Sequence, residues 1–224
     1  MGYYIDLERI TIDEYKTKLE SSYLPPSRLI LKENLEERFG YFKINGIENV
    51  HELLKALKNK KKFAELSRIE CFSDDYLKIL LRELNSMLPK PNKIADFTSI
   101  SKDAIAKLEK IGIKTTEKVF EKLITKLDRQ KLAESTGIDE KEILKLTKLT
   151  DLSRIKWVGV SYAQLLLDLE VDTAEKVATS DPINLHSKIN QKIKEKNIFN
   201  GAIGLNDVKI LVEAATQIPL EIEY

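Results

Sequence analysis

The sequence has one cysteine, two histidines and few glycines or prolines. Cys71 cannot form an internal disulfide, and together with His51 and His186 it is too small a ligand set for a zinc site. Eight glycines and six prolines in 224 residues argue against the many turns of an all-β fold. We therefore expect an all-α protein with no significant β-sheet, no metal and no cofactor.

The sequence also lacks long apolar runs and an excess of charge of one sign. No stretch reaches the roughly 18 apolar residues of a membrane span, and the first residues do not resemble a secretory signal. We expect a cytoplasmic protein that does not contact a membrane. Thirty-seven basic and thirty-six acidic side chains give a net charge of +1, which excludes a histone-like or polyacidic chain.

Helix start and stop signals are present throughout the chain. Thr11 and Glu14 have the spacing of a capping box, and Asp181 precedes Pro182 as an N-cap precedes a first-turn proline. Two prolines in Leu88-Pro89-Lys90-Pro91-Asn92 cannot continue a helix, so this segment is the predicted linker. It separates an N-terminal helical module, residues 1–88, from the rest of the chain.

An internal repeat accounts for much of the chain. The same pattern, a small or polar residue followed by a β-branched residue, a polar residue and an N-cap, occurs in Gly46-Ile47-Glu48-Asn49, Gly112-Ile113-Lys114-Thr115 and Glu170-Val171-Asp172-Thr173. A second N-cap is expected after each, at Ser73, Asp139 and Asn206. The repeat predicts a second module at residues 93–150, a third at 151–218 and a tail at 219–224.

The third module contains a segment with possible binding chemistry, Leu152–Leu166. It resembles a helix-hairpin-helix element, in which a glycine turn joins two closely crossing helices. Gly159 has no Cβ, so a ligand can approach the backbone amides of Val158, Gly159, Val160 and Ser161. These amides precede a helix, whose dipole favours an anion such as a nucleic-acid phosphate.

The chain, most clearly residues 94–215, also resembles a helical family known only as a domain of unknown function and built from tandem hairpins. This resemblance implies tandem helix-hairpin-helix (SAM-like) modules and is silent on activity. The matching stretches are Leu24-Pro25-Pro26-Ser27-Arg28, Leu57-Lys58-Asn59-Lys60-Lys61, Asp75-Tyr76-Leu77, Ile79-Leu80-Leu81-Arg82-Glu83, Leu108-Glu109-Lys110-Ile111-Gly112-Ile113 and Asp151-Leu152-Ser153-Arg154-Ile155.

Three residues depart from the hairpin pattern. Trp157 stands at the first glycine position of the third module, and Ser99 and Ser101 stand at both glycine positions of the second. The indole of Trp157 would crowd a phosphate or stack on a base, but we expect it to be buried as the anchor of its hairpin. These departures weaken the argument for binding more than the argument for the fold.

Basic residues are distributed unevenly. Net charge is +1 for residues 1–90, +3 for 91–150 and −3 for 151–224. Arg154 and Lys156 flank the turn and are candidate phosphate contacts. Lys60, Lys61 and Lys62, with Lys55 and Lys58 before them, form a cluster that either contacts phosphate or is simply a solvated face.

Three functions follow from these features. The first is non-enzymatic, sequence-nonspecific binding of DNA or another nucleic acid through the hairpin amides, with the lysine cluster adding charge. The second is a protein-interaction scaffold, with another protein or a second copy as partner, in which degenerate hairpins keep only the helix-crossing geometry. The third, a DNA lyase or nuclease-type enzyme, has no distinguishing catalytic residue in the sequence.

Overall fold

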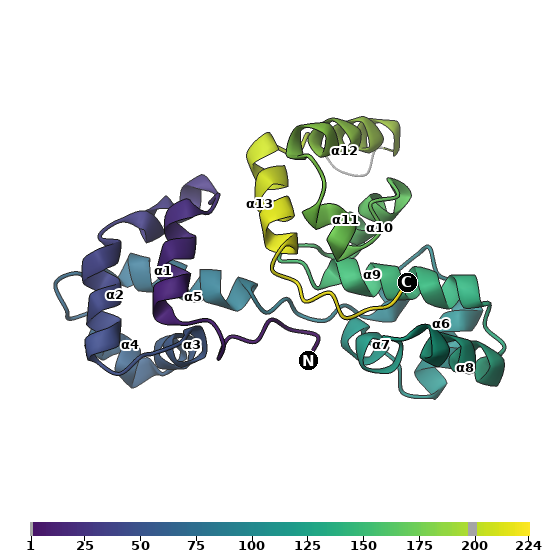
Figure 1. Ribbon diagram of the computed structural model, residues 1–224, viewed down its shortest axis with the longest axis horizontal. Helices are drawn as coiled ribbons and strands as arrows, with labels where there is room; N and C mark the ends of the chain where they lie inside the picture. The colour runs from purple at the N-terminus through teal and green to yellow at the C-terminus, as the bar shows by residue number, and fades with distance from the viewer. Residues whose placement is uncertain (1, 197–200) are drawn as a thin grey trace. The chain divides into compact units, whose positions relative to one another are not determined.

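The computed structural model describes residues 2–196 and 201–224, which are mostly helical (Figure 1). These residues contain no β-strand. Two isolated β-bridges are present, one between Thr11 and Asn49 and one between Lys93 and Thr115. The prediction of an all-α fold is confirmed.

The chain forms two compact units. The smaller contains Ile5–Leu88, and the larger contains Pro89–Tyr224 together with the residues before Ile5. The boundary after Leu88 falls within the predicted linker. Two features differ from the predicted domains: the first residues belong with the larger unit, and residues 93–150, 151–218 and 219–224 lie in a single unit.

The smaller unit packs its helices around an aromatic core. Thr11 caps the first helix as predicted: its Oγ1 accepts the Glu14 amide at 3.2 Å, and Glu14 Oε2 accepts the Thr11 amide at 2.8 Å. Phe42 stacks on Phe72 with 5.0 Å between ring centroids. The elements are α1 (Ile12–Ser21), the 3-10 helix η1 (Pro26–Lys32), α2 (Leu35–Ile44), α3 (Val50–Lys58), α4 (Lys60–Leu66) and α5 (Asp74–Ser86).

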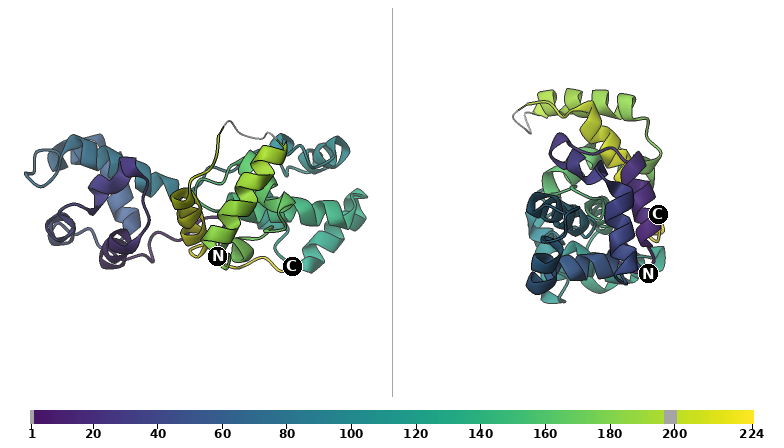
Figure 2. Two further views of the ribbon diagram at one scale, coloured as in Figure 1. Left: turned by 90° about the horizontal axis from the view of Figure 1, so that it is seen from above. Right: turned by 90° about the vertical axis from the view of Figure 1, so that its left-hand side faces the viewer.

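In the larger unit, α9 packs against α7, α8 and α10, and α13 packs against α11 and α12 (Figures 1 and 2). Its elements are the 3-10 helix η2 (Ile94–Asp96), α6 (Lys102–Lys110), α7 (Thr116–Lys122), α8 (Lys126–Thr136), α9 (Glu140–Ser153), α10 (Val160–Asp168), α11 (Ala174–Ala178), α12 (Pro182–Lys196) and α13 (Leu205–Ala215). Asp181 Oδ1 accepts the Asn184 amide at 2.9 Å, so this predicted N-cap is also correct.

Three helix junctions share one backbone geometry. Each has a residue in the left-handed region: Gly46 (φ 77°), Gly112 (φ 86°) and Glu170 (φ 60°). The next amide donates to the carbonyl five residues earlier, the main bond of a Schellman motif. These bonds are Ile47 to Phe42 at 3.0 Å, Ile113 to Leu108 at 3.0 Å and Val171 to Leu166 at 3.1 Å.

The N-caps after these junctions also match. Asn49, Thr115 and Thr173 each accept the amide three residues later. Ser73 and Asp139 cap α5 and α9 as predicted. The prediction for Asn206 is wrong, because Gly204 is the N-cap of α13 and donates its amide to Asp207 Oδ2 at 3.2 Å.

The third junction differs from the other two in the group that accepts the hydrogen bond from the first amide of the helix. Val50 N donates to the Ile10 carbonyl at 3.0 Å, and Thr116 N donates to the Asn92 carbonyl at 2.9 Å. Ala174 N instead donates to the Asp151 side chain, at 2.7 Å from Oδ2. A buried carboxylate therefore takes the place of a backbone carbonyl beside the predicted binding segment.

Candidate functional site

The predicted binding segment, residues 152–166, contains the end of α9, a tight turn over residues 154–159 and most of α10, and is called here the Gly159 hairpin. Ile155 N donates to the Leu152 carbonyl at 3.1 Å, and Val158 N donates to the Ile155 carbonyl at 3.0 Å. Ile155 and Val158 are buried and anchor the turn. Ala163 is fully buried, and its small side chain suits the close packing of α10 on α9.

Amides at the start of α10 are open to solvent. Within residues 2–196 and 201–224, no protein acceptor is bonded to the amides of Gly159, Val160 or Ser161. Gly159 is exposed, and a Cβ built on it meets no atom within 4 Å. Free amides at the positive end of a helix dipole favour an anion. The Val158 amide, also predicted to be available, is instead used inside the turn.

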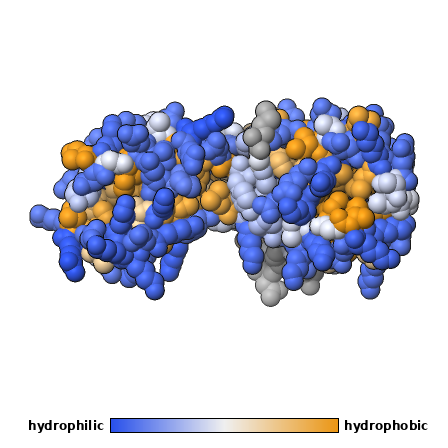
Figure 3. All heavy atoms as spheres, turned by 90° about the horizontal axis from the view of Figure 1, so that it is seen from below, coloured by the Kyte–Doolittle hydropathy of each residue, from blue (hydrophilic) through white to orange (hydrophobic). Residues whose placement is uncertain are grey.

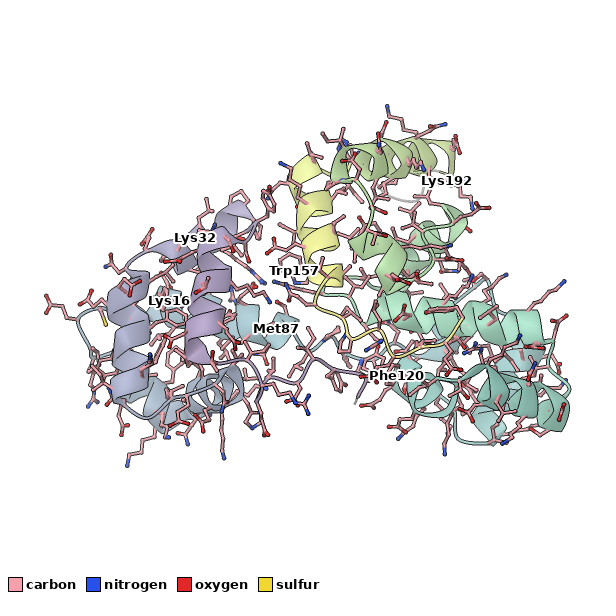
Figure 4. All side chains as sticks on the ribbon, viewed as in Figure 1. Lys16, Lys32, Met87, Phe120, Trp157 and Lys192 are labelled. Carbon is pink, nitrogen blue, oxygen red and sulfur yellow. The ribbon has the colours of Figure 1, made fainter. Side chains whose placement is uncertain are left out.

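The bend itself is made by Trp157 rather than by Gly159. Trp157 has φ 66°, whereas Gly159 has φ −88° and ψ −178°, which any residue can adopt. Trp157, labelled in Figure 4, makes this bend, and because 44% of the residue is exposed the expectation that it is a buried anchor is wrong. Lys156 Nζ lies 4.3 Å from the centroid of the Trp157 ring, a cation–π contact within the turn.

Arg154 cannot contact phosphate, which corrects its predicted role. Only 1% of the residue is exposed. Its guanidinium donates to the carbonyls of Tyr3 and Pro219 at 3.2 and 3.1 Å, and pairs with Asp151 at 3.1 Å. It also lies 4.3 Å from the centroid of the Phe120 ring. Each of its three nitrogens donates to a protein acceptor, so this buried cation is structural, because exposing it would leave several partners unsatisfied.

Asp151 completes this buried cluster. Its Oδ2 accepts the Ala174 amide at 2.7 Å and the Tyr224 hydroxyl at 2.8 Å, while Oδ1 pairs with Arg154. Burial, followed by the nearby Asp151 charge, raises the pKa of Tyr224. The cluster thus joins the hairpin to segments from both ends of the chain, including the predicted tail 219–224.

A second turn, residues 94–108, corresponds to the Gly159 hairpin and is called the Ser101 hairpin. Every position is displaced by 58 residues: α6 runs from Lys102 to Lys110, and α10 from Val160 to Asp168. The anchoring bonds match as well, from Phe97 N to the Ile94 carbonyl and from Ile100 N to the Phe97 carbonyl, both at 3.2 Å.

Glu142, a residue that the sequence did not single out, lies at the Ser101 hairpin. The Ser101 amide donates to Glu142 Oε1 at 2.6 Å, and the Ser101 hydroxyl donates to Oε2 at 3.1 Å. A carboxylate therefore sits at the position equivalent to the open Gly159 amide. No sequence signal identifies this contact, because 41 residues separate the two partners.

The predicted lysine cluster belongs to the other unit. Lys60, Lys61 and Lys62 form the first turn of α4 and are exposed. Asn59 Oδ1 accepts the amides of Lys61 and Lys62 at 3.0 and 3.1 Å, so this helix start is already capped. The available lysine side chains and the hairpin amides are thus on different units. Figure 3 shows that hydrophilic side chains cover much of the face in view, with apolar patches among them.

The described residues contain neither a metal-binding cluster nor a membrane-spanning helix. In the part of the chain that the structure describes, no group of three or more His, Cys, Asp and Glu side chains is arranged to hold a metal ion. No described helix combines the length and the apolarity needed to cross a membrane.

Comparison with known proteins identifies the family of the larger unit. Residues 98–218 match the domain of unknown function DUF4332, a range that contains α6 to α13, the whole Gly159 hairpin and the Ser101 hairpin from residue 98 onward. No curated protein and no solved structure matches the chain. Because the family model covers more than half of the sequence, the chain belongs to the DUF4332 family.

Proposed function

We propose that this protein binds the phosphate backbone of DNA or another nucleic acid, without sequence preference and without catalysis, through the Gly159 hairpin. The observation that carries the proposal is the open row of amides at Gly159, Val160 and Ser161. Such amides hold a phosphate oxygen without contacting a base edge, so they position nucleic acid rather than select a sequence. Arg154 has no part in this contact.

Two neighbouring side chains support the proposal. Lys156 is partly exposed and holds its ammonium over the Trp157 ring, so a positive charge is present in the turn that leads to the open amides. The exposed indole offers a flat surface on which an unpaired base can stack. Lys60, Lys61 and Lys62 supply a second, purely electrostatic contact on the smaller unit. We propose further that the two matching turns are tandem helix-hairpin-helix units, and that the protein acts in the cytoplasm.

The test uses the single tryptophan as a local reporter. Trp157 is the only Trp in the chain, so its fluorescence follows events at this hairpin alone. Titration with a short duplex and with a single strand at low salt should change the emission, with micromolar or weaker affinity and a steep loss as salt rises.

Gly159→Ala is the decisive variant. Its Cβ meets no protein atom within 4 Å and its backbone angles suit alanine, so the fold is expected to be unchanged. The added methyl projects toward the approaching ligand and should weaken binding about tenfold. Gly40→Ala is the matched control, because a Cβ at Gly40 also meets no atom within 4 Å and this glycine lies in the other unit. Equal binding by both variants and the natural protein would contradict the proposal.

A protein-interaction scaffold is the second candidate, favoured by exposed apolar side chains on the larger unit. Trp157 is 44% exposed, and Ile111, Leu127, Ile183 and Leu220 are all more than half exposed. Light scattering across a concentration series, with Trp157→Ala as comparison, tests self-association. A Trp157-dependent dimer that does not respond to nucleic acid would favour the scaffold.

A further inference from the structure

The Ser101 hairpin is closed by a side chain of the same unit. Glu142, in the first turn of α9, accepts the Ser101 amide at 2.6 Å and the Ser101 hydroxyl at 3.1 Å. The same hydroxyl accepts the Ala104 amide at 3.2 Å. Both polar groups of Ser101 are therefore bonded to protein at the start of α6.

A second residue of α9 secures the same turn. Lys145, one helical turn after Glu142, donates its Nζ to the Ser99 carbonyl at 3.3 Å. The two side chains carry opposite charges: the Glu142 carboxylate accepts a backbone amide of the turn, and the Lys145 ammonium donates to a backbone carbonyl of it. This arrangement fixes the carboxylate where the helix dipole stabilises it.

The equivalent place in the Gly159 hairpin has no such carboxylate among the described residues. The corresponding residue of the third module is Asp207, which is the third residue of α13 as Glu142 is the third of α9, and its Oδ2 accepts the Gly204 amide at 3.2 Å rather than an amide of the Gly159 hairpin. Gly159 and Ser101 thus start two matching helices, α10 and α6, yet only Ser101 carries an internal anion.

We propose that Glu142 is a built-in anion that keeps the Ser101 hairpin closed to phosphate, which leaves the Gly159 hairpin as the open one of the pair. A carboxylate and a phosphate compete for the same amide because both are oxygen anions. The inference rests on the proposed function in one respect, the choice of phosphate as the external competitor.

The surroundings of Ser101 would accept a ligand once Glu142 is removed. A groove of about 360 Å³ borders the turn, lined by Phe97, Thr98, Ile100, Lys102, Ile105 and Glu109 among others. Ser101 is exposed, and Lys102 places a positive charge at the first position of α6. The closed hairpin is therefore on the surface and is blocked by one side chain rather than by burial.

The test removes the carboxylate and follows both hairpins. Glu142→Ala should bind a short DNA duplex about threefold to tenfold more tightly at low salt than Glu140→Ala, and its salt dependence should be steeper by about one phosphate contact. Glu140 is the matched control, since it is exposed, lies in the same first turn of α9 and loses the same charge. Glu142→Gln keeps an acceptor oxygen for the Ser101 amide, so a smaller gain is expected.

Backbone amide resonances locate the effect. Adding inorganic phosphate or the duplex to Glu142→Ala should shift the amides of Ser101 to Ala104, whereas in Glu140→Ala these amides should not move. Equal affinity in the two variants, with no shift at Ser101, would overturn the inference. The proposed function is tested separately by the loss of binding in Gly159→Ala. The shifts of the Ser101 amides report on the Ser101 hairpin directly, whether or not the Gly159 hairpin binds nucleic acid.

Discussion

Arg154 donates from its Nε to the carbonyl oxygen of Tyr3 at 3.2 Å, although 151 residues separate the two. The Tyr3 hydroxyl lies 2.8 Å from Thr116 Oγ1, and its ring packs edge-on against Phe120 (labelled in Figure 4). Tyr3 is thus an integral part of the larger unit. The part of the chain that matches DUF4332 begins at residue 98, after Tyr3 in the sequence.

Replacing Arg154 should destabilise the larger unit strongly. Arg154→Ala leaves the Asp151 carboxylate buried without its cation, and we expect a loss of about 3–5 kcal/mol in the free energy of unfolding. Denaturant titration followed by Trp157 fluorescence reports this unit. Lys156 is a neighbouring cation that is partly exposed, so Lys156→Ala should lower the free energy of unfolding far less. A small effect of Arg154→Ala would contradict the structural role assigned to it.

Replacing Glu170 by glycine should stabilise the protein. Its φ of 60° matches that of Gly46 and Gly112, and a non-glycine residue in this region costs roughly 1 kcal/mol. We expect Glu170→Gly to raise the unfolding free energy by up to about 1 kcal/mol, and Gly112→Ala to lower it by a similar amount. Thermal unfolding by circular dichroism measures both, and changes of the same sign would count against a shared junction geometry.

Alkaline pH should weaken the larger unit. Burial, the largest cause, raises the pKa of Tyr3 to about 12 from an ordinary value near 10. The unfolded chain then loses its phenolic proton first, so the stabilisation is complete below pH 10 and is lost as pH rises toward 12. Unfolding free energies measured across this window should fall, and the fall should be shallower in Tyr3→Phe. Identical profiles would exclude Tyr3 as a contributor.

Trp157 should matter more for single strands than for duplexes. Trp157→Gly removes the stacking surface and relieves the left-handed backbone, so stability should change by no more than about 1 kcal/mol. Stacking contributes roughly 1–3 kcal/mol per base, which predicts about tenfold weaker binding of a single strand and little loss for a duplex. Anisotropy of labelled DNA measures both, with Trp157→Phe as the control that retains a ring.

The lysine cluster should control salt dependence without affecting the fold. Replacing Lys60, Lys61 and Lys62 by glutamine removes three exposed positive charges from the start of α4, where the helix dipole disfavours them. Binding should weaken for every sequence, and the slope against salt should fall by up to about three contacts. Glutamine at Lys110, Lys114 and Lys122, exposed residues of the other unit, changes net charge equally. Equal losses in the two triple variants would mean that only net charge matters.

The sequence alone determined the elements that depend on local bonds. The caps at Thr11, Asn49, Ser73 and Asp139 could be predicted because each joins a side chain to an amide two or three residues away. Paired prolines likewise marked the boundary after Leu88. The third cap was placed wrongly at Asn206, because Gly204 caps α13 with no side chain to signal it.

Only the tertiary structure decided which hairpin residues are available to a ligand. Arg154 has the charge of a phosphate contact, but its partners Tyr3 and Pro219 are distant in sequence and bury it. Glu142 and Ser101 meet only when α9 packs near the turn. A pattern of residue types records the chemistry a side chain can perform, whereas contacts between remote segments fix whether that side chain faces solvent or is already bonded within the protein.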